Sequence, residues 1–194
     1  MTTDPRGWSG HVFIATSVDG YLARPDGDLD WLTDPPAEEG HAPAHEGEDA
    51  PPDYDAFTAQ VSHLVMGRGT YEKVLTFDPW PYDRFRVVVL STRLARGRDG
   101  RVTVVASVEE ACAVLAEEGA ISVYVDGGQV VSAFLAQGLV DELTIARAPV
   151  LLGQGLPLFH ALPTETRLIH LGTSTTDSGM TSTRYQVASY AAPR

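Results

Sequence analysis

Short apolar runs alternate with amphipathic segments along most of the chain. The apolar runs are bounded by polar and glycine-rich segments, a pattern typical of buried β-strands. These predicted strands are residues 11–17, 63–67, 86–91, 102–106, 121–125 and 139–146. Between them, apolar residues recur as on one face of a helix. These predicted helices are residues 53–62, 70–77, 107–118 and 129–137. Strands that alternate with helices predict an α/β fold in which a mostly parallel central sheet is flanked by helices.

The C-terminal part of the chain carries a different signal. Residues 166–176 and 180–189 have the pattern of two strands, and a turn sequence joins them at Asp177–Gly179. Strands joined by so short a connection pair antiparallel. We therefore expect an antiparallel C-terminal hairpin at one edge of the sheet.

Residues 35–52 interrupt the alternation. They contain five prolines and several acidic residues but no lysine or arginine, a composition that cannot bury a core. We predict a mobile insertion inside one domain that spans residues 1–194. His41 and His45 lie one helical turn apart there, but Pro43 between them opposes the helix that would bring both to one metal ion, so no metal site is expected.

Composition narrows the class of function. The chain has 194 residues, enough for one domain with a core, and a formal net charge of −12. So acidic a protein repels nucleic acid and anionic membranes, and we expect neither as a partner. The N-terminus lacks the basic and apolar regions of a signal peptide, and the single Cys112 excludes an internal disulfide. Both features are typical of a cytoplasmic protein.

Three unusual segments directly follow predicted strands. They are residues 18–32, 67–70 and 126–128. Parallel sheets bind ligands at the carboxyl ends of their strands, where these segments would meet. In Asp126–Gly128, two glycines open a helix, which suits a phosphate or pyrophosphate group. The turn lacks the third glycine of the usual dinucleotide fingerprint, so a standard Rossmann domain is not expected.

Two arginine-containing turns are candidate anion sites. In Gly67–Thr70, the threonine hydroxyl and Arg68 could each hold a phosphate; the alternative is a tight turn with a solvated arginine. In Leu90–Arg93, two hydroxyls and an arginine suit a phosphate monoester, such as the one on the adenosine ribose of NADPH; the alternative is an ordinary strand end. Neither turn alone decides between these interpretations.

Taken in order, these motifs resemble those of a known family. The matching segments are Ile14–Ala23, Val65–Tyr71, Leu90–Thr92, Val125–Gly128 and Pro149–Phe159. They are similar to the dihydrofolate reductase superfamily and, within it, to the C-terminal reductase domain of the bifunctional riboflavin-biosynthesis deaminase/reductase and its stand-alone relatives. The resemblance covers nearly the whole chain. It implies a single-domain dihydrofolate-reductase-like fold, NADPH as hydride donor, and a homodimer.

The resemblance also implies a cofactor role for residues in each motif. Those flanking the nicotinamide are Ala15, Asp19 and Gly20, and those binding phosphates are Gly67, Arg68 and Thr70. Those at the 2′-phosphate are Leu90, Ser91, Thr92 and Arg93, and those at the pyrophosphate are Gly127, Gly128, Gln129 and Val130. It further implies a cis peptide bond between Gly127 and Gly128.

The substrate side carries fewer signals. Folate-reducing relatives have a carboxylate soon after the first strand, and Asp30 is our candidate for this proton-donating group. Trp31 beside it would stack on the substrate and lower the local dielectric, which favours a protonated carboxyl. The alternative is a surface loop with Trp31 as a core anchor. Tyr21 and Leu152 are further candidates for substrate contact.

The predicted reaction is hydride transfer from NADPH to a C=N or C=O bond of a small heterocyclic substrate, pterin- or pyrimidine-like. Two other interpretations stay open. One is the riboflavin-pathway reductase of 5-amino-6-(5-phosphoribosylamino)uracil, whose phosphate would need basic residues near the substrate loop, where only Arg24 is obvious. The other is a nucleotide-binding module that sequesters a ligand without catalysis.

Overall fold

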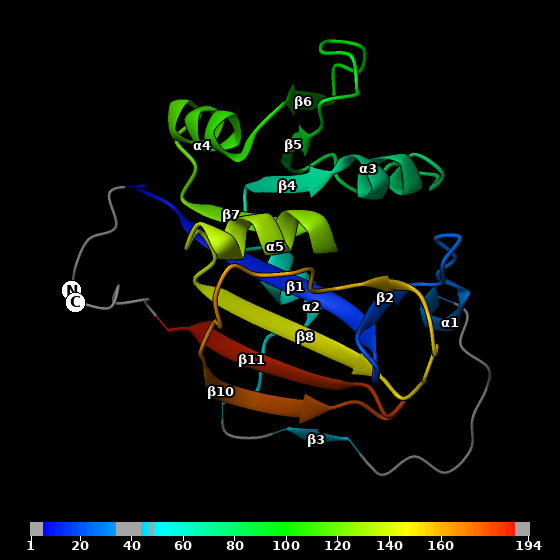
Figure 1. The fold of residues 1–194 in the computed structure, drawn as a ribbon. Coiled ribbons are helices and arrows are strands. Elements are labelled where there is room, and N and C mark those ends of the chain that lie inside the picture. The colour runs from blue at the N-terminus through cyan, green and yellow to red at the C-terminus, as the bar shows by residue number, and fades with distance from the viewer. Residues whose placement is uncertain (1–5, 34–43, 47–48, 189–194) are drawn as a thin grey trace.

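The computed structural model describes residues 6–33, 44–46 and 49–188, which form a nine-stranded and a two-stranded sheet (Figure 1). The strands are β1 (Ser9–Ser17), β2 (Tyr21–Ala23), β3 (His45–Glu46), β4 (His63–Gly67), β5 (Arg86–Leu90), β6 (Val102–Val105), β7 (Ser122–Asp126), β8 (Glu142–Ala148), β9 (Leu156–Pro157), β10 (Leu168–Thr175) and β11 (Thr181–Val187). The large sheet has the order β3-β10-β11-β8-β1-β7-β4-β5-β6. Strands β8 to β6 are parallel, and β11, β10 and β3 continue the sheet antiparallel. The predicted α/β fold with an antiparallel C-terminal hairpin is confirmed.

Helices cover both faces of the sheet. They are α1 (Asp30–Thr33), α2 (Tyr54–Thr58), α3 (Arg68–Val74), α4 (Val108–Glu117) and α5 (Gly128–Ala136). Helices α4 and α5 pack on one face, in front of the sheet in Figure 1, and α2 and α3 contribute to the core on the other. None of the described helices is long and apolar enough to cross a bilayer.

The central strands are buried on both faces of the sheet, and their side chains pack into two separate hydrophobic cores, one on each face. In β4, Leu64 and Met66 belong to the core under α2 and α3, whereas Val65 between them belongs to the core under α4 and α5. All three side chains are fully buried. Because both faces are covered, these strands are continuous apolar runs in the sequence rather than alternating ones.

Two helix ends follow their sequence signals. Ser107 caps α4, and its hydroxyl oxygen accepts the N–H of Glu110 at 3.2 Å. Gly138 follows α5 with φ 67°, and the N–H of Leu139 donates to the carbonyl of Phe134 at 2.9 Å. This is the Schellman arrangement that a glycine after a helix permits.

Other predicted boundaries were wrong. Helix α2 is shorter than the predicted 53–62 because the chain turns at Gln60, whose N–H bonds the carbonyl of Phe57, and then enters β4. Helix α3 begins at Arg68 rather than Thr70 because Gly67, still extended, already serves as its N-cap. The last parallel strand starts at residue 142 rather than 139, because residues 139–141 complete the turn after α5.

The predicted mobile insertion is partly an edge strand. His45 and Glu46 form β3 and pair with Thr175 and Ser174 of β10. Gly172 of β10 lies so close to the carbonyl of Asp49 that a Cβ there would overlap it. The mobility of the insertion stays a prediction, and residues 34–43 and 47–48 lie outside the described part. The 18–32 segment is likewise not a plain loop, since it contains β2 and α1.

Candidate functional site at the carboxyl edge

The turns singled out in the sequence meet at the carboxyl edge of the parallel strands, on the right-hand side of Figure 1. Strand β4 lies between β7 and β5. In register, Gly67 pairs with Leu90, and Met66 pairs with Asp126. The three turns that follow these strands therefore lie side by side, as an extended ligand would require.

The double-glycine turn is packed so tightly that only glycine fits. Gly127 has φ 87°, and a Cβ there would lie 2.5 Å from the hydroxyl oxygen of Thr70. A Cβ on Gly128 would overlap the carbonyl oxygen of Pro157. The turn thus brings α5, α3 and β9 close together.

The resemblance implies a cis peptide bond between Gly127 and Gly128, and this prediction was wrong. Among the described residues, the cis peptide bond lies between Asp78 and Pro79. Gly127 makes its turn through the positive φ that glycine allows.

The turn after β4 carries a charged side chain that is already engaged. Arg68 Nη1 donates to both carboxylate oxygens of Glu72, each at 2.8 Å, one helical turn along α3. Gly69 has open space around it, and Val130 of α5 packs 3.3 Å from the Cβ position of Gly67. Because α3 has only seven residues, its dipole is weak, and an anion bound at this turn would depend mainly on Arg68 and Thr70.

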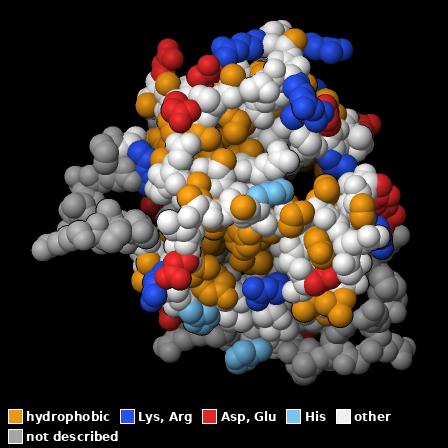
Figure 2. Space-filling model, in the orientation of Figure 1, with side chains coloured by type: hydrophobic (Ala, Val, Ile, Leu, Met, Phe, Trp, Pro, Cys, Tyr) orange, Lys and Arg blue, Asp and Glu red, His pale blue; other side chains and the backbone are white. Residues whose placement is uncertain are grey.

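The turn after β5 is shaped by its own hydroxyl. Ser91 Oγ accepts hydrogen bonds from the backbone N–H groups of Arg93 and Leu94, each with an N···O distance of 3.1 Å. Its hydroxyl proton remains available to a ligand. Thr92 and Arg93 are exposed beside it. Lys and Arg side chains gather at the top of the view in Figure 2, over the β5–β6 region, in an otherwise acidic protein.

These residues fit NADPH on structural grounds. The double glycine leads into α5, and the first turn of a helix offers backbone N–H groups that a pyrophosphate can accept. The adjacent turns offer two arginines and two hydroxyls for a phosphate monoester. The cofactor roles of the individual residues stay predictions.

The turn after β1 is tied to the loop after β8. The carboxylate of Asp19 accepts the hydroxyl of Ser17 at 2.6 Å and the N–H groups of Leu152 and Gly153 at 3.1 and 2.7 Å. These hydrogen bonds, that from Ser17 first, lower the pKa of Asp19. The N–H of Tyr21 donates to Ser17 Oγ. The structure thus brings Asp19, Tyr21 and Leu152 together, although Asp19 and Leu152 lie far apart in sequence.

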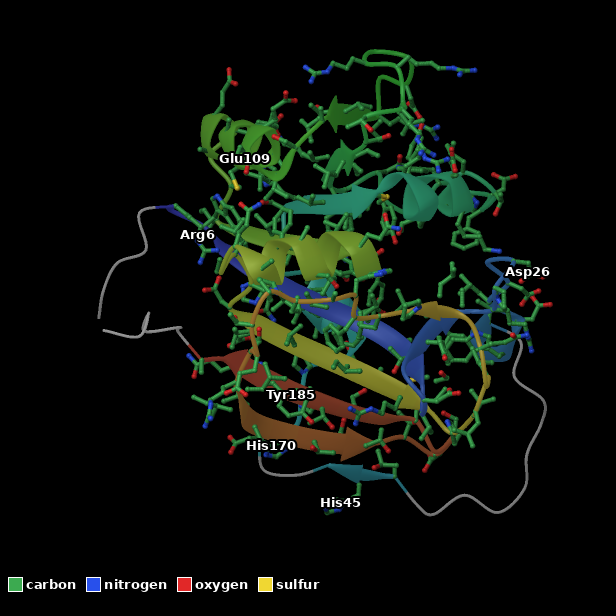
Figure 3. All side chains as sticks on the ribbon, viewed as in Figure 1. Arg6, Asp26, His45, Glu109, His170 and Tyr185 are labelled. Carbon is green, nitrogen blue, oxygen red and sulfur yellow. The ribbon has the colours of Figure 1, made fainter. Side chains whose placement is uncertain are left out.

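Asp30 lies in different surroundings from those we expected. It is exposed at the start of α1, and its N–H donates to Asp28 at 2.7 Å. Asp26, at the outer right-hand end in Figure 3, marks the same acidic loop. Trp31 is buried, as the core-anchor alternative predicts. The catalytic assignment of Asp30 stays a prediction, but its exposure removes the low-dielectric environment on which that assignment relied.

A second carboxylate, Asp126, is placed far better. It ends β7 beside β4, at the carboxyl edge, directly before the double glycine. The residue keeps some exposure, yet desolvation of its carboxyl raises the pKa to about 6, against a single opposing hydrogen bond of 2.8 Å from the N–H of Gly127. A carboxyl that is partly protonated near neutral pH can donate as well as accept a proton.

Three tyrosines lie close enough to this carboxyl to feel its charge. They are Tyr54, Tyr82 and Tyr124. Burial first, and then Asp126, raise the pKa of each tyrosine, so all stay protonated donors. The Tyr124 hydroxyl donates to the carbonyl of Phe13 on β1 at 2.7 Å. Sequence reasoning missed this group because Tyr54 and Tyr82 come from segments far in sequence from β7, which carries Tyr124 and Asp126.

The described residues contain no group of three His, Cys, Asp or Glu side chains close enough to hold a metal ion. Cys112 packs half-buried against the core under α4, and burial raises the pKa of its thiol. Neither feature adds a further chemistry to the carboxyl edge.

Comparison with known proteins points to one family. The model of the RibD C-terminal domain matches residues 10–182. YwjB of Bacillus subtilis (strain 168), an uncharacterized protein, is 34% identical over 165 residues, covering 84% of this chain and 88% of YwjB.

Solved structures agree with this match. A crystal structure from Shewanella sp. PV-4, provisionally named a riboflavin biosynthesis protein, is 34% identical with a TM-score of 0.78, over 93% of this chain and 99% of that one. Dihydrofolate reductase from Enterococcus faecalis, solved with NADP(H), shares the fold at 20% identity with a TM-score of 0.60, over 95% of this chain and 98% of that one.

Proposed function

Because this chain belongs to the RibD C-terminal domain family, we propose that it is a reductase that transfers a hydride from NADPH to a C=N or C=O bond of a pyrimidine- or pterin-like ring. Family and fold point to an oxidoreductase. The observation that carries the finer assignment is the placement of Asp126. A desolvated carboxyl whose charge acts on three tyrosine hydroxyls directly adjoins a turn where only glycine fits.

The cofactor would lie across the three adjacent turns. Gly127 and Gly128, with Gln129 and Val130, would hold its pyrophosphate. The phosphate on its adenosine ribose would lie between Arg68 and the turn Ser91–Arg93, which follow neighbouring strands. When bound, the nicotinamide supplies the hydride. Ala15 and Gly20 lie at the end of β1 and in the turn after it, where they would flank that ring.

The chain itself would supply the proton and the orientation. Reduction of a C=N bond adds a hydride to carbon and a proton to nitrogen. Asp126 would hold that proton, because a pKa of about 6 leaves a useful protonated fraction near neutral pH. The ionised Asp126 carboxylate would accept hydrogen bonds from adjacent N–H groups of the substrate ring. The hydroxyls of Tyr54 and Tyr82 would orient ring oxygens or nitrogens.

The riboflavin-pathway substrate is the second candidate. Arg24, which seemed available in the sequence, is engaged with Asp28 at 2.9 Å. Arg84 is exposed, its guanidinium lies 4.9 Å from the centroid of the Phe85 ring, and its charge partly opposes the rise in the pKa of Tyr54 that burial causes. It is therefore a cation that could receive a substrate phosphate near the proposed ring site.

The test is loss of the nicotinamide absorbance when NADPH is mixed with pterins, oxidised pyrimidines and the phosphoribosylamino-uracil. We expect turnover with at least one ring of these classes. Substituting Asp126→Asn should lower turnover about a hundredfold or more while leaving NADPH binding intact, and Arg84→Gln should matter only for the phosphorylated substrate. Failure of the wild-type protein to bind NADPH would overturn the proposal, and binding without turnover across all classes would favour the sequestering module.

A further inference from the structure

The ion pair between Arg68 and Glu72 occupies the side chain that the proposed cofactor needs. Both contacts from Nη1 measure 2.8 Å. The side chains are 40% and 48% exposed, so either can turn away without disturbing the core. A pair so exposed is weak and exchanges readily for a better partner.

Helix stability does not account for this pair. Cations are disfavoured at the start of a helix and anions toward its end. In α3 the arginine is the first residue and the glutamate follows one turn later, the less favourable order for a pair at this spacing. A different reason for the arrangement must lie in what surrounds Arg68.

Arg68 lies beside the turn that suits a phosphate monoester. Since Gly67 pairs with Leu90, Arg68 and Ser91 continue neighbouring parallel strands. The Ser91 hydroxyl keeps its proton free, and Arg93 forms no ion pair among the described residues. A phosphate held at this turn would compete with the Glu72 carboxylate for the same guanidinium.

Glu72 has a second cation nearby. It lines a cavity of about 290 Å³ between α3 and the β5–β6 loop, together with Arg98, Leu75 and Leu94. Arg98 also forms no ion pair in the part of the chain that the structure describes. Once Arg68 turns to a phosphate, Glu72 can face Arg98.

We propose that Glu72 is a specificity-determining residue that competes with the 2′-phosphate of the cofactor for Arg68 and so limits the preference for NADPH over NADH. This inference rests on the proposed function. Binding then requires one exchange, in which Arg68 leaves a carboxylate for a phosphate. The cost of that exchange applies to a 2′-phosphorylated ligand and not to one without this group.

Two small ligands isolate this exchange. Adenosine 2′,5′-bisphosphate carries the 2′-phosphate and 5′-ADP does not, and neither needs turnover to be measured. By calorimetry, Glu72→Gln should bind the bisphosphate about three- to tenfold more tightly and 5′-ADP about equally, as expected from removing one weak pair and one nearby negative charge. Arg98→Gln should weaken the bisphosphate modestly. Glu165→Gln, which breaks the exposed pair with Arg167, is the matched control and should change neither affinity.

The outcomes separate the two proposals. Unchanged or weaker bisphosphate binding by Glu72→Gln, with a wild-type protein that does bind it, would overturn this inference alone, because Glu72 would then be inert or would orient Arg68 for the phosphate. Absence of binding by both proteins would overturn the proposed NADPH function together with the inference. A gain for both ligands alike would show general charge repulsion and also reject it.

Discussion

The carboxylate of Asp19 accepts the N–H of Gly153 at 2.7 Å, and so ties the turn after β1 to the loop after β8. Leu152 donates to the other oxygen of the same carboxylate at 3.1 Å. Both connected segments carry residues expected to contact the nicotinamide or the substrate. Asp19 therefore positions the wall of the proposed site as well as any group it contacts directly.

Replacing Asp19→Asn should loosen this wall. Asparagine keeps one acceptor oxygen but directs an NH₂ group at a backbone N–H, so one hydrogen bond is lost and a donor faces a donor. We expect KM for the substrate to rise several-fold with a smaller change in kcat, because the change affects positioning rather than the reacting atoms. Steady-state kinetics with NADPH measure both, and an unchanged KM would remove the positioning role.

The same variant should change how stability depends on pH. The folded pKa of Asp19 lies below its ordinary value of 3.8. Its ionised form therefore contributes stability that is present above 3.8 and is lost as the pH falls through the lower folded value. Urea unfolding should show wild type and Asp19→Asn converging in the most acid range. A constant difference at all pH values would contradict this.

Asp126→Asn should make the protein more stable and less active. The folded pKa of about 6 lies above the ordinary 3.8. The stabilising effect of the protonated form is thus complete below 3.8 and is lost as the pH rises through about 6. Asparagine removes the cost of the ionised carboxylate, a gain of about 1–2 kcal/mol at pH 7 after allowance for its partial exposure. Turnover should fall about a hundredfold or more.

Denaturant unfolding at pH 4 and pH 7 measures the predicted gain in the free energy of unfolding, which should be larger at pH 7. The rate of NADPH oxidation measures the predicted loss of turnover. Asp83→Asn is the matched control, since Asp83 is exposed and has no role in the proposed site. A loss of stability in Asp126→Asn at pH 7 would mean that the carboxylate is a structural anchor, and it would reject the proton-holding role.

Sequence reasoning reached the fold wherever a signal was local. Ser107 and Gly138 mark helix ends through contacts within four residues, and both ends were predicted. The buried strands were found because burial on both faces makes each one a continuous apolar run. Sequence reasoning failed where contacts between distant segments determine the structure. Strand β3 forms because His45 pairs with Thr175 of β10, some 130 residues away.

The same dependence on local signals explains which parts of the candidate site could be predicted from the sequence. The turns at Gly67–Thr70, Leu90–Arg93 and Asp126–Gly128 were located because each follows its own strand. Asp126 was noticed only as the flank of two glycines, since the burial that desolvates its carboxyl depends on the tertiary fold and leaves no local signal. Asp30 was preferred because Trp31 adjoins it in sequence, whereas the fold exposes the carboxylate and buries the indole.

Two histidines at the opposite edge of the sheet should make the protein sensitive to mild acid. His11 Nε2 lies 2.8 Å from Ser9 Oγ, and His63 lies 3.3 Å from Glu118. Burial lowers the pKa of both imidazoles below 6.5, although Glu142 beside His11 and Glu118 beside His63 oppose this. The neutral rings contribute stability above 6.5 that is lost as the pH falls through the lower folded values.

The free energy of unfolding should therefore decline between pH 7 and pH 5. In a His11→Asn, His63→Asn double variant the decline should be shallower, whatever its absolute stability. The measured quantity is the slope against pH, so a general loss of packing does not imitate the effect. An unchanged slope would show that the histidines titrate alike in the folded and unfolded chain.

Gly127→Ala should destabilise the fold and abolish cofactor binding. The backbone there has φ 87°, and a Cβ would lie 2.5 Å from Thr70 Oγ1. A side chain in such a backbone conformation costs about 1–3 kcal/mol, and the overlap with Thr70 adds to that.

Gly69→Ala is the control: nothing lies within 4 Å of its Cβ position, and alanine inside α3 should add up to about 1 kcal/mol of stability. Combining Gly127→Ala with Thr70→Ala relieves the overlap but not the backbone strain, so stability should return only in part. Full recovery in thermal unfolding would show that Thr70 alone requires a glycine at position 127.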